Sequence, residues 1–278
     1  MSTAARRFRM VDVFNSGQLS GNPLAVVLDA EGLSDAEMLA FARWMNLSET
    51  TFLLKPTLPA AHYRVRIFTP DGEMDFAGHP TLGSCHAWLE EQTMSANGQR
   101  ILQECRVGLV EVRRTEGGFA FAAPPLIKSG PLGANLVNRI AMSLGIAPEE
   151  ILAAGWVDNG AGWAGVLLED AEAVLRLKPH AVDLDIGVIG PHDAGQPAEF
   201  EVRAFFPKNG ATAEDPVTGS LNAGLAQWLI ADGRARAPYE VRQGTAIGHD
   251  GRLRVSEADG SLWIGGLTTT LVAGTVAL

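Results

Sequence analysis

The sequence predicts an α+β protein made of two similar β-rich halves, each wrapped around one central helix. The first observation is an internal repeat. Residues 64–89 (RVRIFTPDGEMDFAGHPTLGSCHAWL) and 201–229 (EVRAFFPKNGATAEDPVTGSLNAGLAQWL) match at offsets of 137 and 136, close to half of the 278 residues. The second is that strand-like segments outnumber helical ones, with the best helix central in each half. The third is the lack of regular strand–helix–strand alternation, which argues against a doubly wound sheet.

The repeat also predicts the domain organisation and the place of a site. We expect a first half over residues 1–126, closed by Pro124-Pro125, and a second half over 127–278 whose last strand is able to cross back to the first. Two copies of one strand–loop–helix unit suggest two domains related by a pseudo-twofold axis. A site between the halves would receive matching loops from both sides.

The elements of the first half follow from turn signals and hydrophobic periodicity. Ser34 and Glu37 form the pattern of a capping box, so a helix begins there and ends at Asn46. The other expected elements are strands over 9–14 and 23–28, a strand entered through NLSETTFLL (46–54), a strand over 63–68, a helix that begins at Pro80, and a hairpin over 101–123 with a Glu-Gly-Gly turn.

The second half repeats this pattern around its own strand EFEVRAFF (199–206), which precedes a helix beginning at Pro216. Before them we expect a helix around 135–144, another helix begun by Ala147-Pro148, and a strand near 163–168. The tail predicts an alternation of short strands and turns: RLRVSEA, SLWIGG and TTTLVAGTVAL.

Composition excludes several classes of function. A net charge of −10 argues against a nucleic-acid partner, which needs clustered Lys and Arg. No apolar run is long enough to span a membrane, and the start MSTAARRFRMVDVFN lacks the apolar core of a signal peptide. The two cysteines, Cys85 and Cys105, suit a reducing compartment, so we expect a cytoplasmic protein. No metal-ligand spacing and no phosphate-binding loop occurs, so we expect neither a metal nor a cofactor.

The starts of the two repeated helices are the first candidate binding elements. His79-Pro80 and Asp215-Pro216 each place a polar residue before a proline at the first helical position, where its missing N–H costs nothing. Helix N-termini present free N–H groups and a partial positive charge, which suits a small anionic substrate.

Glycine in the first turn of each predicted helix, at Gly83 and Gly219, supports the same interpretation. Each costs roughly 1 kcal/mol relative to alanine, which suggests that something approaches the backbone closely. The alternative is that these glycines only allow close packing; their occurrence in both copies favours binding.

Glu49 is the candidate proton carrier. It lies between a helix and an apolar strand, beside Leu47 and Phe52, and partial desolvation there would raise its pKa. The alternative is a surface glutamate at the entrance of a strand. A Ser48–His79–Asp215 hydrolase triad has no nucleophile elbow to support it.

Four motifs together identify the sequence as similar to the phenazine biosynthesis PhzF-like family over essentially its whole length. They are VDVFNSGQLSGNPLAVV (11–27), NLSETTFL (46–53), RIFTPDGEMDFAGHPTLGS (66–84) and FFPKNGATAEDPVTGSLNAG (205–224). The resemblance implies a diaminopimelate-epimerase-like fold with the active site between two halves, no metal or organic cofactor, and a homodimer. The tail departs from the family pattern, because Gln243-Gly244 is followed by Gly248-His249-Asp250-Gly251-Arg252 where Gly-Arg-Pro-Ser or a similar run is usual.

The resemblance also implies roles for individual residues. The family's best-studied activity is isomerisation of trans-2,3-dihydro-3-hydroxyanthranilate. Its catalytic glutamate falls on Glu49, and its Gly-His pair falls on Gly78 and His79. Its aspartate falls on Asp215, and the Gly-Ser pair that follows falls on Gly219 and Ser220.

From these residues we expect Glu49 to move a proton between two carbons of a small unsaturated acid. His79 and Asp215 would orient the substrate or assist the transfer, while Gly78, Gly219 and Ser220 would bind it. Two other functions stay open: an isomerase or racemase of a different small carboxylic or amino acid, and a non-catalytic small-acid binding protein. A racemase with two cysteine bases is disfavoured, because Cys85 lies past the helix start and Cys105 lies elsewhere.

Overall fold

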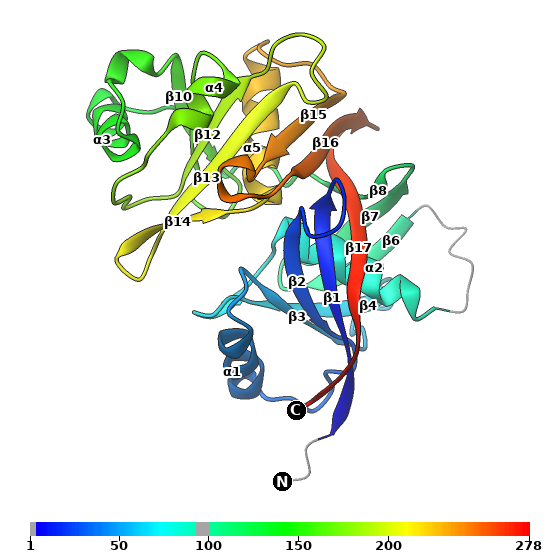
Figure 1. The fold of residues 1–278 in the computed structure, drawn as a ribbon. Coiled ribbons are helices and arrows are strands. Elements are labelled where there is room, and N and C mark those ends of the chain that lie inside the picture. The colour runs from blue at the N-terminus through cyan, green and yellow to red at the C-terminus, as the bar shows by residue number, and fades with distance from the viewer. Residues whose placement is uncertain (1–3, 93–99) are drawn as a thin grey trace. The chain divides into compact units, whose positions relative to one another are not determined.

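The structure, a computed structural model, describes residues 4–92 and 100–278 (Figure 1). Residues 1–3, which belong to the stretch examined above for a signal peptide, lie outside the described residues. The chain forms two compact units. Unit 1 comprises Met1–Ala122 together with Gly265–Leu278, and unit 2 comprises Ala123–Ile264. Each unit combines many strands with few helices, so the α+β prediction is confirmed.

Unit 1 is a ring of paired strands around one helix, α2. Its elements are β1 (Ala5–Asn15), β2 (Asn22–Val27), α1 (Asp35–Met45), β3 (Thr50–Leu54), β4 (Tyr63–Phe68), β5 (Glu73–Met74), α2 (Gly78–Glu90), β6 (Arg100–Cys105), β7 (Gly108–Thr115), β8 (Gly118–Ala122) and the later part of β17 (Ser261–Ala277). Pairing runs from β1 through β2, β3, β4, β6, β7 and β8, and β17 pairs with both β8 and β1. Because α2 contacts β1, β2, β3, β4, β6, β7 and β8, it is the core of this ring.

The first helix of unit 1 confirms the capping box read from the sequence. The Ser34 hydroxyl accepts the backbone N–H of Glu37, and the Glu37 carboxylate accepts the backbone N–H of Ser34. Asn46 ends the helix in the left-handed conformation, with φ of 52°. Met38, Phe41 and Ala42 form the buried face of α1, where Phe41 packs against Phe52 of β3. Local capping chemistry and helical periodicity thus determine this element.

The predicted hairpin over 101–123 is wrong in one respect, because the segment contains three strands. Its second turn, Thr115 to Gly118, was expected and pairs β7 with β8. A further tight turn at Arg106-Val107 separates β6 from β7, with Cys105 paired to Gly108. Gly108 has a φ of +103°, which glycine adopts without steric cost, and this residue allows the chain to reverse.

Unit 2 has a sheet of related topology around its own helix, α5. Its elements are β9 (Lys128–Pro131), α3 (Ala134–Leu144), a single 3₁₀ turn η1 (Pro148–Glu150), β10 (Ala153–Asp158), β11 (Ala164–Leu167), α4 (Ala171–Arg176), β12 (Ile186–Pro191), β13 (Phe200–Lys208), β14 (Ala211–Asp215), α5 (Gly219–Ala231), β15 (Tyr239–Gln243), η2 (Thr245–Ile247), β16 (Gly251–Ala258) and the start of β17. The helix expected from Ala147 is therefore only η1, and α4 is a short helix that the sequence analysis did not predict.

The internal repeat corresponds to one local topology found in each unit. In unit 1, β4 pairs antiparallel with β5 and parallel with β6, and α2 lies between β5 and β6 in sequence. In unit 2, β13 pairs antiparallel with β14 and parallel with β15, and α5 lies between β14 and β15. The duplicated sequence thus specifies a duplicated strand–hairpin–helix–strand unit.

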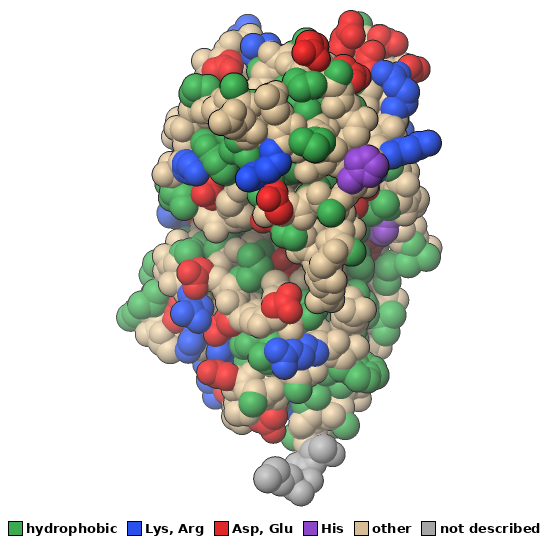
Figure 2. Space-filling view, turned by 90° about the vertical axis from the view of Figure 1, so that its left-hand side faces the viewer, with side chains coloured by type: hydrophobic (Ala, Val, Ile, Leu, Met, Phe, Trp, Pro, Cys, Tyr) green, Lys and Arg blue, Asp and Glu red, His purple; other side chains and the backbone are tan. Residues whose placement is uncertain are grey.

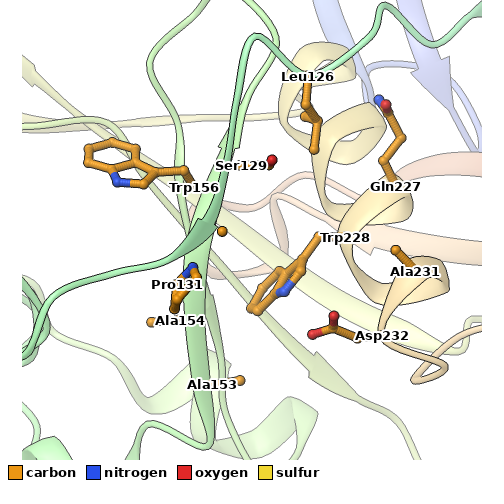
Figure 3. Close-up of a pocket in the computed structure, with 11 residues that line it drawn as sticks. Leu126, Ser129, Pro131, Ala153, Ala154, Trp156, Gln227, Trp228, Ala231 and Asp232 are labelled. Atoms are coloured by element: carbon orange, nitrogen blue, oxygen red, sulfur yellow. The ribbon is translucent and has the colours of Figure 1, made fainter.

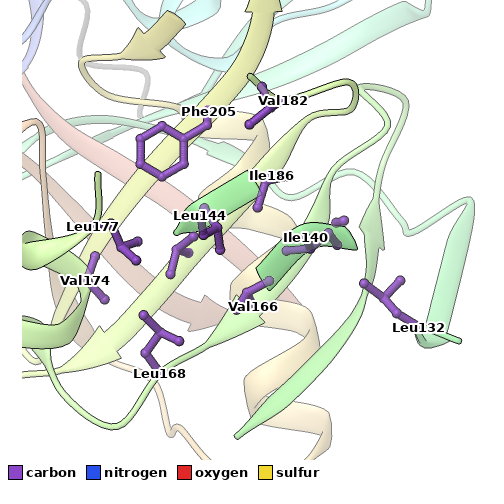
Figure 4. Close-up of a cluster of buried hydrophobic side chains, with 12 residues drawn as sticks. Leu132, Ile140, Leu144, Val166, Leu168, Val174, Leu177, Val182, Ile186 and Phe205 are labelled. Atoms are coloured by element: carbon purple, nitrogen blue, oxygen red, sulfur yellow. The ribbon is translucent and has the colours of Figure 1, made fainter. Parts of the chain in front are cut away.

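Glycines on β12 and on α5 let this helix lie close to the sheet of unit 2. A Cβ atom at Gly187 of β12 would come within 2.1 Å of the Leu221 side chain, and one at Gly224 of α5 would come within 2.2 Å of the Val157 carbonyl oxygen. The other two helices of unit 2, α3 and α4, pack with the strands β11–β13 in an apolar cluster (Figure 4). Its residues are Leu132, Ile140, Leu144, Ala164, Val166, Leu168, Val174, Leu177, Val182, Ile186, Val188 and Phe205.

The C-terminal tail also differs from its prediction. β16 and β17 flank a turn at Asp259-Gly260, where both residues have positive φ, as expected from the Asp-Gly pair. The segments predicted as separate short strands after this turn form the single strand β17, which begins in unit 2 and continues into unit 1 beside β1 (Figure 1).

One face of the molecule carries charged side chains of both signs. On the face shown in Figure 2, Lys and Arg side chains are interspersed with Asp and Glu. None of the helices in the described ranges combines the length and apolar character needed to cross a bilayer.

Candidate active site

Glu49 and His79, to which the resemblance assigns separate roles, lie in contact in unit 1. Glu49 directly precedes β3, and His79 is the second residue of α2. The Nε2 atom of His79 lies 3.4 Å from the Oε2 atom of Glu49, and the two side chains are 5% and 14% exposed. A carboxyl group and an imidazole therefore lie in contact at a helix N-terminus, largely shielded from solvent.

The imidazole of His79 is neutral in this setting. Burial lowers the pKa of His79 to about 3, because the charged form loses its hydration. The distance alone fits an ion pair, but the desolvated ring carries no charge near neutral pH, so the contact is one between a carboxyl group and a neutral imidazole. A neutral ring offers one N–H donor and one acceptor nitrogen, which allows His79 either to give a hydrogen bond or to receive one.

The start of α2 differs from the prediction and leaves backbone donors available. The helix begins at Gly78 rather than Pro80, so Ala77 is the N-cap and Pro80 stands third in the helix. Proline is tolerated there because the first four N–H groups of a helix have no intrahelical partner. The N-cap Ala77 makes no side-chain hydrogen bond to the helix, so no capping side-chain oxygen occupies the backbone N–H groups of Gly78 and His79 in the first turn.

Asp215, the counterpart of His79 in the repeat, ends β14 in unit 2. The helix α5 begins at Gly219, three residues later than predicted, so Asp215 is not its N-cap. Asp215 is instead linked to the N-cap residue, because the Thr218 hydroxyl donates to its Oδ2 atom at 2.6 Å. Asp215 is 9% exposed. The residues predicted in this half, Asp215, Gly219 and Ser220, are thereby gathered at the start of one helix.

A buried glutamine that the sequence analysis gave no role explains why α5 begins late. The side-chain amide of Gln243, on β15, donates to the Asp215 carbonyl oxygen at 3.1 Å and to the Thr218 hydroxyl at 2.9 Å. Its oxygen accepts the Thr218 N–H at 3.1 Å and the Asn222 side-chain amide at 2.8 Å. The orientation of the Gln243 amide is fixed by its two backbone partners, because the Asp215 carbonyl needs a donor and the Thr218 N–H needs an acceptor. All four bonds of Gln243 therefore go to the loop and first turn, which fixes residues 215–218 in a non-helical conformation.

Unit 1 also contains a buried glutamine on the strand that corresponds to β15, two residues earlier in the strand register than Gln243. Gln103, on β6, donates to the Thr81 hydroxyl in the first turn of α2 at 3.0 Å and accepts from the Tyr63 hydroxyl at 2.9 Å. Gln103 and Gln243 are each 0% exposed. We call this pair the glutamine anchors. A signal for them existed in the sequence, since each stands near the end of the strand that follows a repeated helix.

The interpretation of Gly83 needs correction, whereas that of the two cysteines does not. Gly83 lies in the second turn of α2, where an added Cβ would meet side-chain atoms of Leu24 at 2.5 Å and Val13 at 2.9 Å. Gly83 thus serves close packing against β1 and β2, which was the alternative interpretation. Cys85 and Cys105 are buried, and burial raises the pKa of Cys85 to about 12. A thiol held in its protonated form is a poor base.

A pocket in unit 2 does not contain the predicted residues. It has a volume of about 590 Å³ and lies at the C-terminal end of α5, the opposite end from Gly219 (Figure 3). Trp228 and Asp232 from the helix face Pro131 of β9 and Ala154 of β10 across it. The pocket therefore gives no support to the chemistry assigned to the helix starts.

Sequence comparison places this arrangement in a known family. The profile described as "Phenazine biosynthesis-like protein" (PhzC-PhzF) matches residues 11–274. The chain belongs to the PhzC-PhzF family. It is 35% identical to a trans-2,3-dihydro-3-hydroxyanthranilate isomerase of Pseudomonas fluorescens over 90% of both chains. It is 34% identical to "Antisense-enhancing sequence 1" of Schizosaccharomyces pombe, over 96% of this chain and 97% of that protein.

Solved structures support the same family and fold. A PhzF family protein of Enterococcus faecalis superposes with a TM-score of 0.79 at 26% identity, over 99% of this chain and 100% of that one. A hydroxyproline epimerase of Agrobacterium vitis shares the fold with a TM-score of 0.58 at 14% identity, over 99% and 93% of the chains. Several family members carry the name isomerase, and this PhzC-PhzF chain is an isomerase of the same type.

Proposed function

We propose that this PhzC-PhzF protein is a cofactor-independent isomerase that moves a proton between two carbons of a small unsaturated carboxylic acid. Three Pseudomonas relatives named trans-2,3-dihydro-3-hydroxyanthranilate isomerase, at 33–35% identity, support a substrate of that type. The observation that carries the mechanism is the contact between Glu49 and the neutral ring of His79 at the start of α2.

In this mechanism Glu49 is both the base and the acid. Its carboxylate removes a proton from one carbon of the substrate, and the electron pair of the broken C–H bond spreads over the unsaturated acid. The protonated Glu49 then returns the same proton to a second carbon, so the enzyme ends in its starting state. Backbone N–H groups at helix starts stabilise the delocalised anion, because they present partial positive charge without needing to reorganise.

The other predicted residues bind and orient the substrate in this proposal. Neutral His79 keeps the Glu49 carboxyl group oriented and offers a hydrogen bond to a polar substituent. Asp215 accepts a hydrogen bond from a substituent such as an amino or hydroxyl group. Gly78, Gly219 and Ser220 supply donors for the acid group of the substrate.

The decisive experiment replaces the proton carrier while keeping its shape. Glu49→Gln is expected to lower kcat by about 10²- to 10⁴-fold, the usual contribution of a general acid–base group, and to leave ligand affinity nearly unchanged. Glu149→Gln, an exposed residue of η1, is the matched control and keeps full activity. Turnover of Glu49→Gln at the wild-type rate on an accepted substrate would refute the role of Glu49.

The choice of substrate is tested separately. Purified protein is incubated in D₂O with a panel of small unsaturated acids and amino acids, and conversion is followed by proton NMR. A single shuttling carboxyl group gives product with little deuterium when the site is closed to water, whereas a two-base racemase labels its product. Binding without conversion or exchange over the whole panel would indicate a small-acid binding protein instead.

We further propose a cytoplasmic homodimer. The buried free thiols Cys85 and Cys105 fit a reducing compartment, and the homodimer follows the family resemblance. Size-exclusion chromatography with light scattering tests the dimer: a mass close to that of one 29.5 kDa chain would contradict it.

A further inference from the structure

The glycine-rich turn between β10 and β11 is held in one conformation by hydrogen bonds to the Asp158 carboxylate. The Oδ1 atom of Asp158 accepts the backbone N–H groups of Gly160 and Gly162, each at 2.8 Å. Both glycines have positive φ, 118° and 80°, which other residues rarely adopt. The carboxylate and the two glycines therefore determine the path of this turn, and Trp163 at its end is buried with 5% exposure.

The turn contacts the start of α5 through two side chains that act on the same residue. Asn159 donates its Nδ2–H to the carbonyl oxygen of Ser220 at 2.8 Å. Trp163 donates its Nε1–H to the hydroxyl oxygen of Ser220 at 3.1 Å. One contact therefore holds the backbone of Ser220, and the other acts on its functional group.

In the hydrogen bond between Trp163 and Ser220, the donor and acceptor roles are fixed. An indole N–H is a donor only, so the Ser220 oxygen has to be the acceptor. A serine hydroxyl has one proton, and that proton then points to a different acceptor. We propose that Trp163 is a positioning residue that sets the Ser220 hydroxyl as a hydrogen-bond donor toward the acid group of the substrate.

The equivalent serine in unit 1 shows that this arrangement is not a general feature of the repeat. Ser84 is 0% exposed, and its hydroxyl donates to the Thr51 hydroxyl at 2.9 Å inside the unit. Ser220 is only partly buried and receives a donor instead. The duplicated serine is thus structural in one copy and set for donation in the other.

This inference rests on the proposed function and narrows its substrate class. The Trp163 N–H occupies one of the two lone pairs of the Ser220 oxygen and restricts rotation of the hydroxyl, so its proton is directed to the ligand. A carboxylate, which has only acceptors, suits this proton better than a carboxamide, which also carries N–H donors. Trp163 therefore favours ionised acids over their neutral amides at Ser220.

The test compares anthranilate with anthranilamide as ligands in isothermal titration calorimetry. In Trp163→Phe the ring is kept but the donor is lost, so the Ser220 hydroxyl can rotate and accept. We expect the ratio of anthranilate to anthranilamide affinity to fall about three- to tenfold, the effect of one net hydrogen bond. In a Ser220→Ala background the same Trp163→Phe change is expected to leave the ratio unaltered. Asn159→Ala, which removes only the contact to the carbonyl oxygen, is the control and should preserve the ratio.

Two outcomes would overturn the inference without touching the proposed function. One is an equal loss of affinity for both ligands in Trp163→Phe; the other is an undiminished effect of Trp163→Phe when Ser220 is already alanine. Either result would mean that Trp163 acts through packing.

A second measurement does not depend on the ligand or on the folding of Trp163→Phe. In ¹⁵N-labelled protein, Ser220→Ala should speed hydrogen exchange of the Trp163 indole N–H and shift its resonance upfield. An unchanged resonance would disprove the hydrogen bond. If the wild-type protein neither binds nor converts any small acid, the proposed function fails, while this measurement still reports on Trp163.

Discussion

The glutamine anchors allow a quantitative prediction, because two buried glutamines on corresponding strands make different numbers of hydrogen bonds. Gln243 makes four bonds to the loop and first turn of α5, whereas Gln103 makes two, to Thr81 and Tyr63. Both side chains are fully buried, so the groups left behind by a truncation to alanine cannot easily reach water. Each buried group that loses its partner costs about 1–3 kcal/mol.

From these counts we expect Gln243→Ala to lower the free energy of unfolding by about 3–5 kcal/mol and Gln103→Ala by about 2–3 kcal/mol, part of the loss being relieved by local rearrangement. Gln196→Ala, at an exposed position of the same chain, is the matched control and should change the free energy by less than about 0.5 kcal/mol.

The assay is equilibrium unfolding in guanidinium chloride, followed by both tryptophan fluorescence and far-UV circular dichroism. Using two probes shows whether the two units unfold in one transition or in two. The free energy of unfolding is then obtained by linear extrapolation for each transition. The reasoning is refuted if Gln243→Ala costs no more than Gln103→Ala, or if both behave like Gln196→Ala.

Further predictions concern pH, packing and capping. His79 has its pKa lowered by burial to about 3 in the folded protein, so the unfolded chain binds a proton that the folded one does not between about pH 6.5 and 3. The contribution of neutral His79 to stability is therefore complete above pH 6.5 and is lost as the pH falls toward 3, by up to about 1.4 kcal/mol per pH unit. In chemical denaturation between pH 7 and pH 4, the free energy of unfolding should fall less steeply with decreasing pH in His79→Gln than in wild type. Gly83→Ala should destabilise the protein by about 1–3 kcal/mol despite the better helix propensity of alanine, because its methyl group would overlap Leu24, and a thermal shift to higher temperature would contradict this. Ser34→Ala should cost about 1 kcal/mol by removing the capping box with Glu37, and a loss of the same size in Ser34→Thr would argue against the capping role.

The parts of the fold that could be read from the sequence are those encoded locally or by duplication. The capping box of α1 needs only two residues three positions apart, and its helix begins and ends where expected. The repeat located both central helices, because the same strand, loop and helix occur in each half. The family resemblance singled out Glu49 and His79, but their contact is visible only in the structure, because neither residue has a local pattern that predicts it.

The parts that could not be read depend on residues far apart in the sequence. The local proline rule placed the second helix start at Pro216, but Gln243 on a later strand holds the preceding loop in a non-helical conformation. Trp163 and Ser220 are 57 positions apart, and no periodicity links them. Gly83 was interpreted as a sign of ligand approach, because the residues that pack on it, Leu24 and Val13, come from strands whose position relative to α2 the sequence does not state.

The course of β17 has a consequence for how the protein is made. Unit 2 is one continuous stretch of chain, Ala123–Ile264, whereas the ring of unit 1 is closed by residues 265–278, which follow unit 2 in the sequence. During synthesis the first strands of unit 1 leave the ribosome before unit 2, yet β1 has no partner on its β17 side until residues 265–278 have also been made. Unit 2 can therefore complete its own sheet before unit 1 does, which reverses the usual N-to-C order of domain folding. A protein in which residues 265–278 are blocked or removed would keep a complete sheet in unit 2, while the ring of unit 1 would stay open.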